Sequence, residues 1–500
     1  MSFFCKLRQS RLKWKTTATG RGKIIKNLKK KLCRYIIRLL KAEKSILLLK
    51  EENTILRSII EENFPITKQT ATIIDFRSLC VSLVIKGIVP FRAVPRILNA
   101  HQEYENFPIP IPHFTSVINW SLRVGVAVYQ TIAPVSFPWV AIIDCSIDVG
   151  TRKALVVLRV PMDAIQKNNG AIGLQHCQCV GIKVSSKWNG PLVNDALAEF
   201  FKIAGNPVAI LKDGGSDLEY GVHLYREATE RKNIVVIDDV GHVVANALKS
   251  EFAKQTSFEK FLKIVKNGAA RIRQTDLAWL LPPKIRTKGR FQGISRVAKW
   301  AMKIVDSMGG QGRAEKNSEL NSLRKSFTGL AQIRPFVELF SITCIIVEQF
   351  LKILKLKGLT QDTYREAKEL LQQIPTEKVR TKLQSWLDKH ILIQCRLAMG
   401  QRPLIVSSDA IESLFGKFKT IIQRNPQAEL NRLIYIIPLL CGTYAKNDIS
   451  TALHACSHQQ MLDQIEKTVP ETLRQQRNRI LKRKRENGPE MMPCECPRDG

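Results

Sequence analysis

The sequence predicts an α/β core that is split by a long helical block and preceded by further helices. Between residues 138 and 240, short apolar runs rich in Val, Ile and Leu alternate with helical patterns, as in a sheet covered by helices. Between residues 241 and 402 only helical periodicity is found. A chain of 500 residues is also too long for one hydrophobic core, so several domains are expected.

The chain carries a large excess of positive charge. It has 78 Lys and Arg residues against 44 Asp and Glu residues, a formal net charge of +34. Such an excess indicates a polyanionic partner, because each neutralised phosphate releases condensed counterions. Membrane surfaces are anionic too, but no apolar run reaches the roughly 20 residues that span a bilayer. We therefore expect double-stranded DNA as the partner, and no membrane.

The cysteine pattern argues against a structural zinc site. The 12 cysteines are scattered singly, apart from Cys177-Gln-Cys179 and Cys494-Glu-Cys496, and neither pair has the spacing of a zinc knuckle. The basic N-terminus lacks the apolar centre of a signal peptide. The sequence thus predicts an intracellular protein with reduced thiols. It would be nuclear in a eukaryote, and cytoplasmic and nucleoid-associated in a bacterium.

The first 63 residues predict a DNA-binding arm and a dimerising helix. Residues 1–31 contain many Lys and Arg and no acid, which suits a phosphate-binding arm as well as a solvated tail. Over residues 32–63, apolar side chains occupy alternating heptad positions, with one Asn that would fix the register of a parallel pair. These positions are Leu32, Tyr35, Leu39, Ala42, Ile46, Leu49, Asn53, Leu56 and Ile60. A coiled coil in a homodimer or higher homo-oligomer is favoured over an amphipathic helix packed on its own domain.

Residues 70–130 predict three helices, near 73–86, 91–100 and 114–130. Helices of these lengths next to a basic arm favour a helix-turn-helix-like DNA-binding domain, although many three-helix units bind no DNA. Polar residues on the last helix would then face the major groove. These are Thr115, Ser116, Asn119 and Arg123.

After a linker at residues 131–138 the pattern changes to strands. The predicted order is three strands, a helix, a strand, a helix and a strand, which matches a ribonuclease H-like fold with a mixed sheet. The strands fall near residues 140–147, 154–160, 180–185, 207–211 and 234–237, and the helices near 191–204 and 218–231. The core is predicted to span 138–240 and 403–445, with a helical insertion at 241–402 and a basic tail without fixed structure at 470–500.

Three carboxylates stand where this fold could bring them together. Asp144 ends an apolar strand, Asp213 follows another, and Glu412 lies in the first turn of a later helix. Each has an ordinary explanation: a strand end, a turn in Asp-Gly-Gly, and a helix cap. Together they would supply the oxygen ligands that two Mg²⁺ ions need about 3.5–4 Å apart. Asp148 and Asp238 are the alternatives for the first two positions.

Three segments resemble those of DDE transposases, a family of the ribonuclease H-like (retroviral integrase-like) superfamily. Asp213-Gly-Gly-Ser-Asp-Leu resembles the segment that bears the second Asp, and Ser408 to Lys419 resembles the helix that bears the final Glu. Asp239-Val-Gly-His242 resembles the Cys/Asp-x-x-His motif of hAT-like, Mutator-like and some bacterial insertion-sequence transposases. The resemblance covers about residues 138–425. Asp409 stands where the family usually has Asn, and no zinc-finger module is found, which leaves the subfamily open.

The resemblance implies the roles of the site residues. Asp144, Asp213 and Glu412 would bind Mg²⁺, with Mn²⁺ able to substitute, and Asp239 with His242 would brace the site. Basic residues on the last helix would face DNA, namely Lys417 and Lys419. A basic and aromatic loop in the insertion suits flexed or single-stranded DNA, although it could be an ordinary exposed loop. Its predicted contacts are Lys288, Arg290 and Arg296.

These features favour a metal-dependent transposase that binds transposon ends, cleaves a strand and transfers it to target DNA. A DNA-binding regulatory or architectural protein with a catalytically inert core is the alternative, and it would show no dependence on Mg²⁺ or Mn²⁺ in a nicking assay. A nuclease without strand transfer, such as a resolvase, is a third possibility that would never join ends. Three intact acids favour the transposase.

Overall fold

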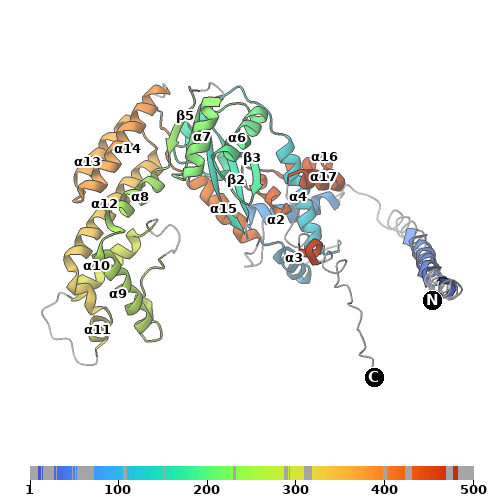
Figure 1. Cartoon of the computed structure of the whole chain (residues 1–500), viewed down its shortest axis with the longest axis horizontal. Helices are drawn as coiled ribbons and strands as arrows, with labels where there is room; N and C mark the ends of the chain where they lie inside the picture. The colour runs from blue at the N-terminus through green and yellow to red at the C-terminus, as the bar shows by residue number, and fades with distance from the viewer. Residues whose placement is uncertain are drawn as a thin grey trace, which may run out of the picture. The chain divides into compact units, whose positions relative to one another are not determined.

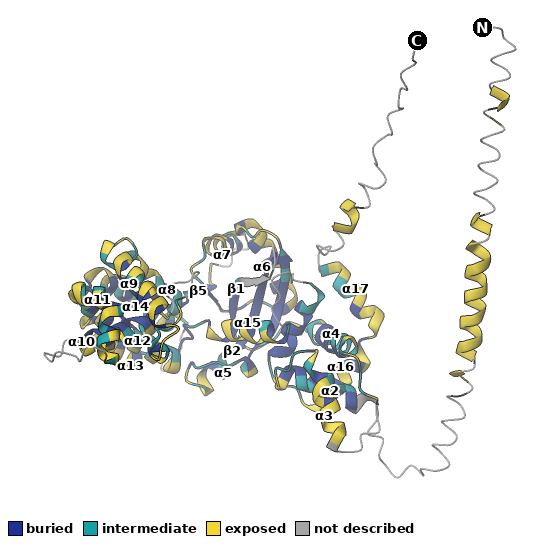
Figure 2. Ribbon diagram, turned by 90° about the horizontal axis from the view of Figure 1, so that it is seen from below, coloured by how far each residue is buried: buried dark blue, intermediate teal, exposed yellow. Residues whose placement is uncertain are grey.

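The structure, a computed structural model, divides the chain into two compact units, Met1–Thr72 and Ile73–Gly500. In the first unit, residues 31–47 are helical and their apolar side chains are exposed (Figure 2). The rest of the predicted coiled coil, from Asn53 onward, lies outside the described residues. The described residues are 10–12, 14, 27–29, 31–47, 49–50, 52, 73–104, 110–149, 152–228, 232–285, 291, 293–308, 318–397, 402–422, 431–468 and 477–481.

The second unit is built on a mixed five-stranded sheet (Figure 1). Its spatial order is β3-β2-β1-β4-β5; β2 is antiparallel to both β1 and β3, and β4 is parallel to both β1 and β5. This is the ribonuclease H-like arrangement, and each strand lies within a few residues of its predicted position. The strands are β1 (Trp139–Val149), β2 (Arg152–Pro161), β3 (Gln178–Ser185), β4 (Ala209–Lys212) and β5 (Val235–Asp238).

Both faces of the sheet are buried, which explains the continuous apolar runs of its strands. On β1, Trp139, Ala141 and Ile143 join one hydrophobic cluster with α6 (Gly190–Ala204) and α7 (Ser216–Ala228). The alternate residues Val140 and Ile142 join the larger cluster on the other face, which includes α15 (Asp409–Ile421). Two short elements were not predicted, α5 (Met162–Lys167) and η1 (Leu174–His176).

The helical insertion leaves and rejoins the core at neighbouring points. Between Val240 and Leu397 the described residues form helices and no strand, apart from one isolated bridge between Leu359 and Leu404. Val240 N donates a 2.9 Å hydrogen bond to Val406 O, so the chain returns beside the place where it left. The elements are α8 (Val240–Phe252), α9 (Thr256–Ile272), η2 (Ala278–Leu280), α10 (Ser295–Met308), α11 (Glu319–Gln332), α12 (Arg334–Lys357), α13 (Gln361–Gln372) and α14 (Glu377–Arg396).

The helices before the sheet pack against helices from the C-terminal end of the chain. The third of them, α4, contacts segments that follow the core, so it is enclosed on several sides. Among the described helices, none is long and apolar enough to cross a membrane. The elements of this region are α2 (Ile73–Lys86), α3 (Ala93–Tyr104), α4 (Phe114–Gln130), η3 (Arg432–Leu440), α16 (Lys446–Ala455) and α17 (His458–Thr468).

Candidate active site

Asp144 and Asp213 come from neighbouring parallel strands and lie at the same edge of the sheet. Asp144 is on β1 directly after Ile143, and Ile143 pairs with Lys212, the last residue of β4 before Asp213. Both acids line one cavity of about 460 Å³. Asp144 is 4% exposed, so its carboxylate is held away from bulk solvent. The structure therefore brings together two of the three predicted acids.

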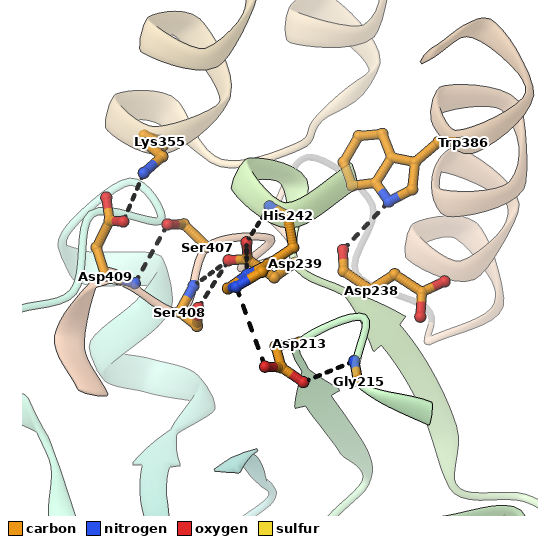
Figure 3. Close-up of polar contacts among 10 residues, drawn as sticks. All are labelled: Asp213, Gly215, Asp238, Asp239, His242, Lys355, Trp386, Ser407, Ser408 and Asp409. Carbon is orange, nitrogen blue, oxygen red and sulfur yellow. Dashed lines mark hydrogen bonds and ion pairs between the residues drawn. The ribbon is translucent and has the colours of Figure 1, made fainter. Parts of the chain in front are cut away.

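The turn after β4 orients the Asp213 carboxylate. Its Oδ1 accepts a hydrogen bond from the backbone N–H of Gly215 at 2.9 Å, the turn chemistry that Asp-Gly-Gly indicates. Its Oδ2 lies 4.0 Å from Nε2 of His242 (Figure 3). One oxygen is thus fixed by the turn, and the other faces the imidazole.

Asp239 connects the end of the sheet to the helix that carries Glu412. It caps α8, where Oδ1 accepts from the backbone N–H of His242 at 2.8 Å and lies 3.0 Å from its Nδ1. Its Oδ2 accepts from the N–H and the hydroxyl of Ser408, at 2.7 and 2.8 Å. Figure 3 shows these bonds meeting at one carboxylate. Asp239 therefore fixes the start of α15 against the start of α8.

Asp239 and His242 each stabilise the charged form of the other. Burial raises the pKa of Asp239, but the bonds from His242 and Ser408 outweigh burial and leave this pKa below its ordinary value. The bond to Asp239 raises the pKa of His242 to about 9 against the opposing effect of burial, and Asp213 and Glu412 add to the rise. His242 is consequently protonated at neutral pH, and its positive charge lies among three carboxylates.

Glu412 lies in the adjacent cavity rather than beside Asp144. That cavity, of about 210 Å³, is lined by Glu412, Asp239, Phe291, Arg296 and Lys355, among others. Although the Glu412 side chain as a whole is exposed, partial burial of its carboxyl group raises its pKa, and the nearby Asp409 and Asp239 raise it further. Among the described residues, no three His, Cys, Asp or Glu side chains gather into a ready metal-binding group.

Asp238, the alternative for the second acid, is occupied by other partners. Its Oδ1 lies 2.8 Å from Nζ of Lys212, and its Oδ2 lies 2.8 Å from Nζ of Lys389. Burial raises the pKa of Asp238, but the two lysines outweigh burial and lower it to about 2. These ion pairs leave Asp213 as the better candidate. The side chain of Asp148, the alternative for the first acid, lies outside the described residues.

Two insertion helices are bonded to the core beside the acids. On α14, Trp386 Nε1 donates to Asp238 O at 3.1 Å, and His390 Nε2 accepts from Asp238 N at 3.0 Å. On α12, Lys355 forms an ion pair with Asp409, three residues before Glu412. The sequence did not indicate Lys355 or Ser408, because only their neighbours in space give them a role. For Ser408, its place before the predicted helix was the one available signal.

Of the four α4 residues predicted to face a DNA groove, Arg123 and Asn119 are turned towards other parts of the protein. Arg123 donates to the carbonyl oxygens of Cys456, at 2.7 Å, and Leu453, so it closes the end of α16 instead. The Asn119 Oδ1 atom is buried. Thr115 is exposed and lies 2.9 Å from His113 Nδ1 through its hydroxyl, and Ser116 is half-buried. The reason is that α4 packs against segments more than 300 residues later.

The other predicted DNA contacts have different outcomes. Arg296 is exposed in the first turn of α10 and lines the Glu412 cavity. Lys417 is exposed on α15 and Lys419 is half-buried there. Lys288 and Arg290 lie outside the described residues.

Comparison with known proteins gives a structural likeness and no match in sequence. No family model matches the chain, and no curated protein matches it. A solved structure, the Drosophila P element transposase strand transfer complex, is similar over 80% of this chain and 98% of that chain, with 13% sequence identity and a TM-score of 0.38. At this level the likeness assigns no residue role to this chain. The roles of the site residues rest on the geometry described above.

Proposed function

We propose that this chain is a DNA transposase that cleaves strands at transposon ends and joins them to target DNA through Asp144, Asp213 and Glu412. One observation carries the proposal: Asp144 and Asp213 line one cavity at the shared edge of neighbouring parallel strands in a ribonuclease H-like sheet. Asp239 holds the start of the Glu412 helix against this edge through Ser408.

The donor set fits a divalent metal ion at its first two positions. Asp144 and Asp213 offer carboxylate oxygens in one cavity, and hard cations such as Mg²⁺ prefer oxygen ligands. Mg²⁺, for which Mn²⁺ can substitute, would stabilise the attacking and leaving oxygens of the phosphodiester. Glu412 would be the third ligand, from the adjacent cavity. His242 then provides a fixed positive charge between the cavities, which suits a phosphate bridging them.

Further parts of the chain would hold the DNA. Arg296 lies beside Glu412, and Lys417 with Lys419 lie further along the same helix, so all three are proposed to contact phosphates near the cut. Lys288 and Arg290 are proposed to extend this contact, and Thr115 and Ser116 remain candidates on α4. Residues 1–31 would bind element ends, and residues 32–63 would pair two protomers.

Conservative changes to the acids test the proposal. Asp144→Asn, Asp213→Asn and Glu412→Gln each remove a charge without changing size, so Mg²⁺-dependent or Mn²⁺-dependent nicking by the purified full chain is expected to fall to background. The substrate is DNA flanking its gene on a supercoiled plasmid, and joined products are scored as well. Binding to the same DNA, measured by fluorescence anisotropy, should stay within about twofold, because phosphate contacts dominate affinity.

Asp163→Asn serves as the matched control, because Asp163 is an exposed acid on α5. This variant should nick as wild type does. Retained nicking in any one of the three site variants would remove that acid from the proposed site.

A second candidate function is a DNA-binding regulatory or architectural protein with an inert core. The observation in its favour is that Glu412 lines a different cavity from Asp144 and Asp213. In that case the wild-type chain would bind the DNA and show no metal-dependent nicking at any concentration of Mg²⁺ or Mn²⁺.

A further inference from the structure

The cavity that holds Asp144 and Asp213 is also lined by residues from the start of β2 and from the loop after β3, which lie side by side because the two strands are antiparallel. Lys153 comes from the start of β2, and Lys187 with Trp188 come from the loop between β3 and α6. None of the three belongs to the carboxylate set, and nothing in the sequence pattern singled them out. The cavity therefore combines acids with an aromatic ring and two lysines.

Local hydrogen bonds fix the position of the Trp188 ring. Its Nε1 donates to the carbonyl oxygen of Lys153 at 3.1 Å, which ties the loop to β2. The Ser185 hydroxyl donates to Lys187 O at 2.6 Å and accepts from Lys187 N at 3.3 Å, which closes a tight turn before the ring. The indole packs partly against the hydrophobic cluster under α6 and α7, while it also lines the cavity. The ring is thus held in place before any ligand arrives.

The two lysines are available for a ligand. Both side chains are exposed, and within the described part of the chain neither Lys153 nor Lys187 lies within ion-pair distance of an acid. The cavity also contains three carboxylates, Asp144, Asp213 and Asp217. Carboxylates alone would repel a phosphate group, so the exposed lysines in the same cavity supply the charge that a nucleic-acid strand needs.

We propose that this cavity binds an unpaired nucleotide of the DNA strand next to the phosphate that is cut. The Trp188 ring stacks on its base, and Lys153 and Lys187 contact the flanking phosphates. The proposal rests on the proposed function and adds a substrate-binding wall to that site. A volume of about 460 Å³ is within the range of ligand pockets, and an indole face accepts any base that is free of its pair.

The test is photocrosslinking of the full chain to a 12-nucleotide single-stranded DNA in which 5-iodouracil replaces one thymine. Irradiation joins this base to an aromatic ring stacked on it, and the joined peptide is mapped by mass spectrometry. EDTA is present, so no cleavage occurs. The crosslink is expected on the peptide that contains Trp188 and should be several times weaker with the same sequence as a duplex.

Variants make the outcome decisive. Trp188→Leu should remove this crosslink, Trp188→Phe should keep it, and Lys153→Gln or Lys187→Gln should lower its yield severalfold. Trp279→Leu is the matched control, because Trp279 is 73% exposed on the insertion, and it should leave the Trp188 crosslink unchanged. A crosslink that maps elsewhere, persists in Trp188→Leu or is equally strong with duplex DNA overturns the proposal.

The design separates this inference from the proposed function. Loss of nicking in the acid variants without a crosslink at Trp188 would mean that the catalytic proposal stands and the binding wall is wrong. A crosslink at Trp188 in a chain that never nicks DNA would mean the reverse: the cavity binds a strand, and the metal-dependent chemistry is wrong.

Discussion

Two buried charged residues, Lys212 and Asp239, support the candidate site. Lys212 is 1% exposed and pairs with Asp238 and Glu219, so its pKa lies above the ordinary value although burial alone would lower it. Asp239 is 3% exposed and accepts bonds from His242 and Ser408. A buried charge without partners costs several kcal/mol. These complete sets of partners therefore explain why charges can be buried directly beside Asp213.

The buried histidine at the contact between insertion and core predicts a pH dependence. Burial lowers the pKa of His390 from 6.5 to about 4 and outweighs the bond to Trp386 O and the charge of Asp238, which both raise it. A lowered folded-state pKa contributes stability that is complete above about pH 6.5 and lost as the pH falls towards 4. The loss is about 3 kcal/mol. Urea unfolding followed at several pH values between 7 and 4 measures it.

His390→Gln is the variant for this measurement, since Gln can also accept the bond from Asp238 N and does not titrate. The titrating carboxylates change the stability of both proteins equally. The difference in the free energy of unfolding between wild type and variant therefore isolates the contribution of His390. If both proteins lose the same free energy of unfolding between pH 6.5 and pH 4, the neutral buried state assigned to His390 is wrong.

At the scale of elements, two helical glycines differ in what surrounds them. One is required by a close contact between elements, and the other is an ordinary helix position. Gly125 on α4 lies against η3, where an added Cβ would be 1.8 Å from the carbonyl oxygen of Tyr435. Gly416 on α15 has nothing within 4 Å of an added Cβ. The packing of α4 against η3 therefore depends on one missing methyl group, and that of α15 does not.

Alanine at each glycine should give opposite results. Gly125→Ala should destabilise the chain by about 1–3 kcal/mol or more, because two backbones must move apart. Gly416→Ala should stabilise it by roughly 0.5–1 kcal/mol, since alanine is the better helix former. Thermal unfolding of the two variants measures both effects. Equal changes in the two would contradict the close contact between α4 and η3.

The elements that the sequence predicted share a local cause. Strands β1 and β2 were predictable because both faces are buried, which makes the apolar run continuous. The lengths of α4 and α6 were predictable from their own periodicity. The surroundings of α4 were not, because its neighbours η3 and α16 come from the far end of the chain. Arg123 looked like a DNA contact for that reason.

The candidate site also has parts that could be predicted from the sequence and parts that could not. Asp144 and Asp213 could be predicted to meet, because each directly follows an apolar run and the two runs pair in parallel up to Ile143 and Lys212. The cavity of Glu412 could not be predicted, because it depends on where Phe291 and Lys355 of the insertion lie. The role proposed for Trp188 could not be predicted either, because an aromatic residue in a loop does not by itself indicate a binding site. Only the structure shows that it lines the cavity.

At the scale of the whole molecule, we expect the chain to be a dimer through residues 32–63. In the described part of this segment, Leu32, Leu39 and Ile46 are at least 52% exposed on one helix. Leu39→Lys combined with Ile46→Lys places charges in the predicted seam and should convert dimer to monomer. Light scattering after gel filtration measures the mass.

Lys41→Ala with Lys44→Ala is the control for that measurement, because both residues lie off the predicted a and d positions of the same helix. It should leave the mass unchanged. An unchanged mass in the double lysine variant would assign self-association, if any, to another part of the chain.

The bond between Asp239 and Ser408 also sets when the site can exist during protein synthesis. The two residues are 169 positions apart, and the whole insertion is translated between them. At about 5–20 residues per second, the ribosome needs roughly 10–30 seconds to make that stretch. Asp144 and Asp213 are therefore synthesised well before α15. A growing chain therefore carries Asp144 and Asp213 before the proposed third acid, Glu412, has been made.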